Sequence, residues 1–385
     1  YTHNCTVNDI ACPYSLHQPH PPPPLSLRLS LQAPTHSMII LSWWYPWWKS
    51  NRDLLTPISG DSTSYVGSIV IRNSMGAPTR VFYPAASKGR GLKRTPMFRQ
   101  GIVMFIRGYM ILALRQSMPN YMISVIFWLI IPLVFLNPIA YALLPRCYNS
   151  APITPPPPST KYPLLVFSHG LSGTGCEHGL MGVTLALRGY VCAFPHHSDG
   201  SSSLCEKVDA STKKVERTLY KHPNFHNYDN MLRQRQVEHR AVEVNEAREM
   251  LLSHPDIGPF LDGGNVVVGG FSFGGSTAGL VAVMNPEKYR AAVFVDGWWK
   301  VNFPQYGIEI DLPSQLHNTS MSLPTLMLSS TEMNNIPNIR EKQHHIEGQC
   351  TAVENQIIME GTRHGNFIDA VYWVPSCLAR FVNLS

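Results

Sequence analysis

The sequence predicts an α/β fold in which a mostly parallel central sheet is flanked by helices. Three observations lead to this prediction. Short β-rich runs alternate with stretches of helical character from residue 162 onward. These runs are apolar on both faces, as expected of parallel strands that helices cover on each side. The chain has 385 residues, of which 44% are hydrophobic and 15% charged, so it can bury a sizeable core.

The folded pattern begins near residue 56. Residues 65–72 and 79–83 are expected to form a hairpin. Later strands are expected at residues 164–168, 191–194, 266–269, 292–295, 325–328 and 356–359. The helices expected between them cover residues 179–187, 234–252, 276–284 and 339–345. In the second of these helices, apolar residues recur at three- and four-residue spacing, and we expect the charged residues to fill the other face.

Two segments depart from this alternation. Residues 1–55 are expected to form a disordered, proline-rich leader with a tryptophan-rich apolar patch at 38–48, and residues 56–385 the folded domain. Residues 88–160 are expected to form an apolar insertion before the third strand. This insertion opens with basic residues, and residues 121–144 then contain no charge in 24 positions, which is long enough to span a bilayer core. Two interpretations stay open for it: a helix pair packed on the domain, or a helix seated in or on a membrane.

A candidate nucleophile lies where a β-branched run, residues 266–268, leads into Gly270-Phe271-Ser272-Phe273-Gly274. A serine hydroxyl becomes a useful nucleophile when a sharp strand–helix turn lifts it towards a base. Such a turn needs glycine two residues to either side. The alternative is a purely structural turn. Because this motif falls at a strand–helix junction of an alternating α/β pattern, the sequence predicts an α/β-hydrolase fold with Ser272 as nucleophile.

The serine needs a histidine base and an acid, in the chain order serine, acid, histidine. His364 follows the last predicted strand, where the loop that carries the base is expected. Two residues could supply the acid. Asp296 directly follows the strand after the nucleophile, and Glu332 follows the next strand along the chain.

An oxyanion hole needs backbone N–H groups that face the developing alkoxide. The residue after the nucleophile, Phe273, is one expected donor. Leu171 is the other, in the turn after the strand at 164–168. We expect a structural role for His169 in that turn.

Metal and nucleic-acid binding are not indicated. The cluster at residues 196–199 lacks the histidine pair at i and i+4 that a helix offers zinc, so we expect no metal and no cofactor. The formal net charge of +6 comes without a dense basic run that tracks aromatic residues, and we therefore expect no nucleic-acid partner.

Several blocks of the chain together resemble the platelet-activating-factor acetylhydrolases. The blocks are YPLLVFSHGLSG, VCAFPHHSDGSSS, RQRQVEHRAVEV, GGFSFGGST, AVFVDGWW and GTRHGNF, in this order. The resemblance covers roughly residues 56–380. It implies a metal-independent serine hydrolase that cleaves the sn-2 acetyl or short or oxidised acyl ester of phospholipids at a membrane or lipoprotein surface.

Carried over by position, this resemblance puts the nucleophile at Ser272, the acid at Asp296 and the base at His364. The oxyanion donors fall on Leu171 and Phe273. Two features depart from the family: Phe271 stands where histidine usually precedes the nucleophile, and the apolar stretch at 121–144 is more membrane-like. Two rival functions stay open, a general carboxylesterase or polyester-type hydrolase of the same fold, and a non-catalytic binding protein.

Overall fold

The computed structural model describes residues 64–87, 91–115, 117–135, 142–223, 229, 231–303, 308–317, 319–349 and 353–369. The predicted leader at 1–55 and its tryptophan-rich patch lie outside these residues, as does the segment after residue 369.

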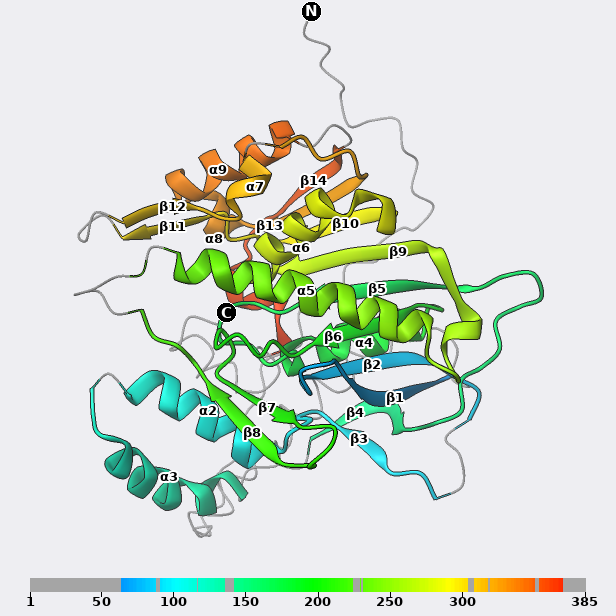
Figure 1. Cartoon of the computed structure of the whole chain (residues 1–385), viewed down its shortest axis with the longest axis horizontal. Coiled ribbons are helices and arrows are strands. Elements are labelled where there is room, and N and C mark those ends of the chain that lie inside the picture. Colours follow the sequence, from blue (N-terminus) through cyan, green and yellow to red (C-terminus); the bar gives the residue numbers. More distant parts are fainter. Residues whose placement is uncertain are drawn as a thin grey trace, which may run out of the picture. The chain divides into compact units, whose positions relative to one another are not determined.

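The described residues form a ten-stranded sheet with strand order β14-β13-β10-β9-β5-β6-β2-β1-β4-β3 (Figure 1). Neighbouring strands from β14 to β6 run parallel, whereas β2 is antiparallel to both β6 and β1. The strands of this sheet are β1 (Tyr65–Arg72), β2 (Pro78–Ala85), β3 (Arg94–Pro96), β4 (Leu143–Asn149), β5 (Tyr162–Ser168), β6 (Val191–Pro195), β9 (Leu261–Phe271), β10 (Ala291–Val295), β13 (Thr325–Ser330) and β14 (Val353–Met359). Every strand expected from the sequence is present.

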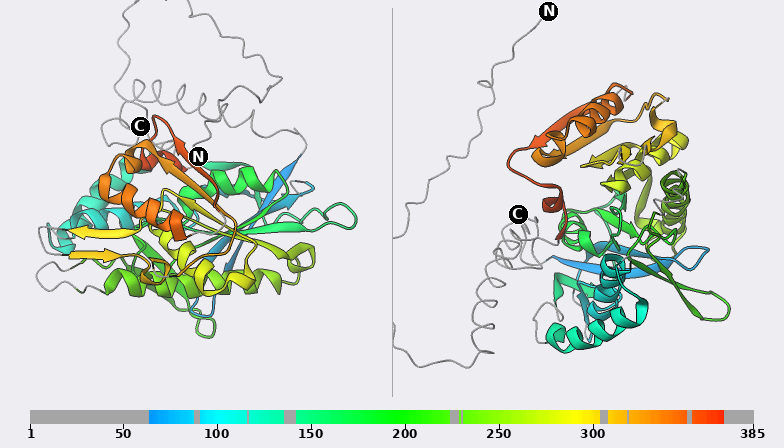
Figure 2. Two further views of the ribbon diagram at one scale, coloured as in Figure 1. Left: turned by 90° about the horizontal axis from the view of Figure 1, so that it is seen from above. Right: turned by 90° about the vertical axis from the view of Figure 1, so that its left-hand side faces the viewer.

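Helices cover both faces of the sheet (Figure 2). On one face, α5 and α6 pack over β5 and β9 and enclose the larger apolar core. On the other face, α4 packs over β2, β4 and β6. The helices are α2 (Ile102–Leu114), α3 (Asn120–Phe135), α4 (Gly179–Ala186), α5 (Leu232–Leu252), α6 (Phe273–Met284), α7 (Ser314–His317), α8 (Thr331–Asn334) and α9 (Pro337–Gln349). Two small hairpins, β7 (Leu204–Val208) with β8 (Val215–Leu219) and β11 (Lys300–Phe303) with β12 (Ile308–Asp311), complete the described part of the fold.

The segment 88–160 differs from the prediction. Besides two helices, it supplies β3 and β4, and β4 pairs with β1 in the main sheet. The apolar run at 121–144 is therefore not one continuous helix, because α3 ends at Phe135 and β4 begins at Leu143. Within the described part of the chain, no helix has the length and apolar character needed to cross a membrane. The helix pair exists, since α2 packs against α3.

Candidate active site

The strand–helix turn that carries Ser272 has the conformation expected of a nucleophile elbow. Strand β9 ends at Phe271 and α6 begins at Phe273, so Ser272 alone makes the turn, with φ 54° and ψ −119°. This left-handed conformation is strained for a non-glycine residue. A Cβ at Gly270 would lie 1.9 Å from the Gly274 carbonyl oxygen, and one at Gly274 would lie 2.0 Å from the Ser168 carbonyl oxygen. Steric exclusion thus explains both glycines of the motif.

The structure brings Asp296 and His364 together, although 68 residues separate them. Asp296 directly follows β10 and is 1% exposed. Its Oδ2 lies 2.8 Å from His364 Nδ1. The Ser330 backbone N–H donates to Oδ1, and the Ser330 hydroxyl donates to Oδ2, each at 2.7 Å. A buried carboxylate held by these donors is suited to orient an imidazole ring and to stabilise its protonated form.

Glu332, the other candidate acid, also contacts His364 but at a different atom. Its Oε2 accepts the backbone N–H of His364 at 2.8 Å, and its own N–H donates to the Thr362 carbonyl at 3.2 Å. Glu332 therefore holds the loop that carries the imidazole, whereas Asp296 contacts the ring itself. The geometry separates two roles that the residues alone left open.

The imidazole of His364 lies beside the elbow. It stacks on the ring of Phe271, with centroids 4.6 Å apart and planes 28° from parallel. Since Nδ1 is engaged by Asp296, Nε2 is the ring nitrogen that can accept a proton. In this conformation the hydroxyl of Ser272 forms no hydrogen bond with His364 among the described contacts. In unliganded enzymes this contact is often long and tightens when substrate binds.

The predicted oxyanion segment, the turn after β5, packs directly against the elbow. A Cβ at Gly170 would lie 3.0 Å from the Phe271 ring and 3.4 Å from Ser272 Cβ. On the elbow side, the Ser272 carbonyl accepts the N–H groups of Gly275 at 2.8 Å and Trp298 at 3.0 Å. These bonds fix the peptide that carries the Phe273 N–H. The roles of Leu171 and Phe273 as donors stay predictions.

A buried polar network lies behind this turn, and sequence reasoning missed it. The hydroxyl of Ser168 lies 2.8 Å from His197 Nε2, and His197 Nδ1 lies 2.7 Å from Glu243 Oε2. Burial, reinforced by the charge of Arg240, lowers the pKa of His169 and of His197 well below the usual range. Both imidazoles are therefore neutral at physiological pH, and His169 acts as a structural hydrogen-bonding group.

The expectation that the charged residues of the helix predicted at 234–252 face solvent is wrong for two of them. Arg240 and Glu243 are 0% and 1% exposed and lie on the face that packs on the sheet. Arg240 stands three residues after Val237, and Glu243 stands four residues before Ala247, so the helical spacing placed both on the apolar face. Within the described residues, no three His, Cys, Asp or Glu side chains form a group that could hold a metal ion.

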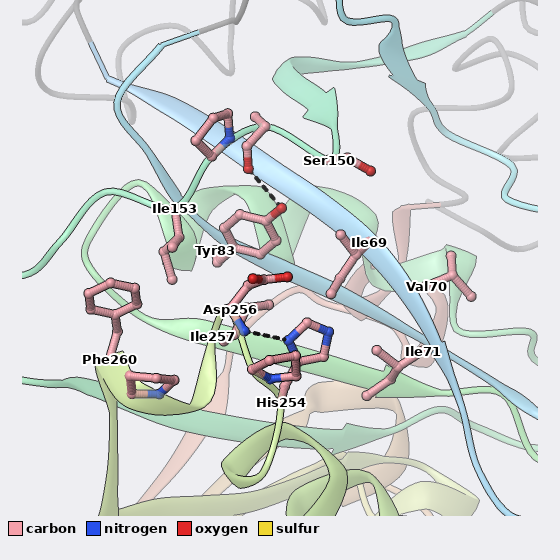
Figure 3. Close-up of a pocket in the computed structure, with 14 residues that line it drawn as sticks. Ile69, Val70, Ile71, Tyr83, Ser150, Ile153, His254, Asp256, Ile257 and Phe260 are labelled. Atoms are coloured by element: carbon pink, nitrogen blue, oxygen red, sulfur yellow. Dashed lines mark hydrogen bonds between the residues drawn. The ribbon is translucent and has the colours of Figure 1, made fainter.

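A separate cavity (Figure 3) lies where the loop before β9 meets β1 and the residues that follow β4. The cavity has a volume of about 790 Å³. Residues 254–257, 259 and 260, which follow α5 and precede β9, line it, so it lies near the amino-terminal end of β9. Ser272 and Asp296 lie at the carboxyl ends of β9 and β10, away from this cavity. Two hydrogen bonds lie within its lining: Tyr83 donates to the Ala151 carbonyl at 2.9 Å, and the Asp256 N–H donates to His254 Nδ1 at 3.2 Å. None of the predicted site residues lines it.

Comparison with known proteins shows sequence similarity to a family of ester hydrolases. The sequence model of the family described as "Platelet-activating factor acetylhydrolase, isoform II" matches residues 133–259 and 256–385. Curated proteins named platelet-activating factor acetylhydrolase are also similar. That of Cavia porcellus is 23% identical over 241 residues, which cover 58% of this chain and 52% of the relative. That of Canis lupus familiaris is 28% identical over 160 residues, 36% of this chain and 35% of the relative.

The chain thus spans about half the length, or less, of the curated relatives it matches. Among solved structures, a ferulic acid esterase from Streptomyces cinnamoneus aligns with a TM-score of 0.50 at 16% identity and covers 83% of both chains. This likeness concerns the fold, and it confirms the α/β-hydrolase prediction.

Proposed function

The chain belongs to the platelet-activating factor acetylhydrolase isoform II family, and from this membership and the site geometry we propose that it is a serine ester hydrolase. We propose further that its substrates are phospholipids with an acetyl, short or oxidised acyl chain at sn-2. The observation that carries the proposal is the convergence of a strained serine elbow, an imidazole stacked beside it and a buried carboxylate on that imidazole.

In the proposed mechanism, the Ser272 hydroxyl rotates to His364 Nε2, which takes its proton as the oxygen attacks the sn-2 ester carbonyl. Asp296 keeps the proton on Nδ1 and stabilises the imidazolium. The carbonyl oxygen becomes an oxyanion held by the N–H groups of Leu171 and Phe273, each worth about 3–4 kcal/mol in comparable enzymes. The imidazolium then protonates the leaving lyso-lipid oxygen, and an acyl-enzyme forms. Water, deprotonated by His364, hydrolyses it.

Access to phospholipid requires contact with a lipid surface, and we propose helix α3 for this contact. One face of the helix packs inward through Ile123, Phe127 and Ile131. The opposite face leaves large apolar side chains in solvent: Tyr121 is 70% exposed, Val125 58%, Trp128 69% and Leu129 70%. An uncharged helix with both faces apolar is unusual at a water-exposed surface and is suited to seat in a lipid interface.

The test of this contact is flotation with phosphatidylcholine vesicles. The double change of Trp128 and Leu129 to serine is expected to abolish co-flotation and to leave hydrolysis of a water-soluble acetyl ester unchanged. Val242→Ser, at a site on α5 that is 54% exposed, is the matched control and is expected to bind vesicles like the unchanged chain. Equal flotation of all three proteins would show that α3 does not carry the contact.

The substrate class is tested with a panel of phosphatidylcholines that differ only in the sn-2 chain, from acetyl to palmitoyl, beside water-soluble aryl esters. The proposal predicts that kcat/KM falls as the sn-2 chain lengthens, and that Ser272→Ala abolishes turnover. Ser211→Ala, at an exposed loop serine, is the control and should be fully active. Turnover of aryl esters alone would favour a general carboxylesterase, and no turnover of any ester would favour a binding protein.

A further inference from the structure

Arg240 is a fully buried cation that contacts both parts of the predicted oxyanion hole. It lies on α5 and is 0% exposed. Its Nη1 donates to the His169 carbonyl at 2.7 Å, and Nη2 lies 3.4 Å from the Gly170 carbonyl oxygen. Its guanidinium carbon also lies 4.6 Å from the centroid of the Phe273 ring. A buried charge is costly unless it is well partnered, so such a residue calls for an explanation.

The partners of Arg240 hold it in one orientation. Nε donates to the Ser201 hydroxyl at 2.7 Å and lies 3.5 Å from Asp199 Oδ2. The loop after β6 supplies these partners. It is itself bonded to the turn after β5, since the Ser172 N–H donates to the Ser201 carbonyl at 2.7 Å. Helix, loop and turn therefore form one rigid unit around the guanidinium.

The carbonyl of Gly170 matters because it shares a peptide plane with the N–H of Leu171. In a trans peptide these two groups point in opposite directions, so fixing the oxygen aims the N–H. Three donors surround the oxygen: Arg240 Nη2, His169 Nδ1 at 2.7 Å and the Gly173 N–H at 3.2 Å. Because the charge of Arg240 adds to burial in keeping His169 neutral, the arrangement of these donors does not change near neutral pH.

We propose that Arg240 is a positioning residue of the oxyanion hole, which aims the Leu171 N–H through the Gly170 peptide and packs over the residue that supplies the second N–H, Phe273. This inference rests on the proposed ester hydrolysis. Arg240 touches no reacting atom, so it acts on the transition state only through the direction of these two donors. Misaimed donors weaken transition-state binding and leave ground-state binding intact, which lowers kcat and not the affinity for substrate.

The test compares Arg240→Lys with Arg248→Lys on the same helix. Arg248 makes the same kinds of contact away from the site: its guanidinium lies 5.7 Å from the Tyr289 ring centroid, and its Nε donates to the Lys288 carbonyl at 3.2 Å. For hydrolysis of an acetyl aryl ester, Arg240→Lys is expected to lower kcat about 10- to 100-fold with KM within threefold, in line with partial loss of an oxyanion donor. Arg248→Lys is expected to leave both constants unchanged.

A second readout separates positioning from a general structural role. An aryl boronic acid forms a tetrahedral adduct on the serine and so resembles the transition state, whereas an ether phospholipid without the sn-2 ester reports ground-state binding. Arg240→Lys should weaken the boronate inhibition constant by about the same factor as kcat, and it should leave ether-lipid affinity within twofold. Ser201→Ala removes one acceptor of the guanidinium. It should lower kcat and weaken boronate inhibition three- to tenfold, and it should leave ether-lipid affinity within twofold.

Each outcome decides the matter. Equal kinetics for the two lysine variants, or parallel losses of boronate and ether-lipid affinity, would overturn the positioning role. If Arg240→Lys does not fold, Ser201→Ala decides by the same criterion. Absence of turnover by the unchanged chain would instead count against the proposed function, and so can be told apart from failure of this inference alone.

Discussion

Replacing Asp296 by asparagine tests the assignment of the acid, and the structure predicts how the change acts. Asp296 accepts three hydrogen bonds: the Ser330 N–H on Oδ1, and the Ser330 hydroxyl and His364 Nδ1–H on Oδ2. Asparagine has one oxygen. If this oxygen keeps the Ser330 N–H, the amide nitrogen faces His364 Nδ1 and needs an acceptor there. The imidazole then carries its proton on Nε2, where it cannot take the proton of Ser272.

The size of the effect follows from this tautomer change. A base held in the wrong tautomer, with its carboxylate removed, costs about 10⁴ in kcat in serine hydrolases of this type, equivalent to roughly 5 kcal/mol of barrier. The fold should persist, since the shape of the side chain is unchanged. The assay is steady-state hydrolysis of a chromogenic acetyl ester, with urea unfolding as the check on folding.

Glu332→Gln is the matched control, because it also contacts His364 but through the backbone N–H. Glutamine keeps an acceptor oxygen, so kcat is expected to stay within tenfold of the unchanged chain. An active Asp296→Asn enzyme, or a larger loss for Glu332→Gln, would refute the assignment of the acid and move the role to Glu332.

Two further predictions concern the surroundings of the site. Burial lowers the pKa of His178 to about 3, from about 6.5 when unfolded. Since the unfolded chain binds the proton between these values, the stability that His178 contributes is present above pH 6.5 and is lost as pH falls, by about 2 kcal/mol between pH 7 and pH 5. His178→Leu should flatten the pH dependence of urea unfolding by that amount, and an unchanged slope would contradict it. Asp369 accepts the Leu180 N–H at the start of α4 at 2.8 Å, so Asp369→Ala should lower unfolding free energy by about 1–2 kcal/mol and Asp369→Asn by less, as judged by urea unfolding; equal losses would count against a capping role.

The parts of the fold that sequence predicted well are those that local chemistry fixes. Strand β5 and the second half of β9, residues 266–271, are apolar on both faces, and the elbow after β9 is specified by Gly270 and Gly274, whose Cβ atoms would collide with backbone. These features need no knowledge of distant contacts, so the residues alone were sufficient to find them.

The features that sequence missed depend on long-range pairing. Strand β4 (Leu143–Asn149) continues an apolar run that is typical of a helix, and it contains a proline. It forms a strand because it pairs with β1. Likewise, the spacing of Arg240 and Glu243 places them on the apolar face of α5, but their charge favours exposure unless partners are available. The polar turn after β5 and the loop after β6 supply partners that allow these charges to be buried.

The choice between Asp296 and Glu332 is of the same kind. Both follow neighbouring parallel strands, and both contact the residue at 364, one through the ring and the other through the backbone. Spacing along the chain carries no information on which atom each would reach. The stacking of Phe271 on His364 was equally hidden, although the unusual residue before the nucleophile was visible in the sequence.

Covalent labelling is the most direct test of Ser272 as the nucleophile. The chain is incubated with a fluorophosphonate probe, digested, and the labelled peptide identified by mass spectrometry. We expect one adduct, on Ser272, formed in step with loss of ester hydrolysis and strongly slowed in Asp296→Asn. An active enzyme that is labelled at another serine, or that stays unlabelled while it is inhibited, would contradict it.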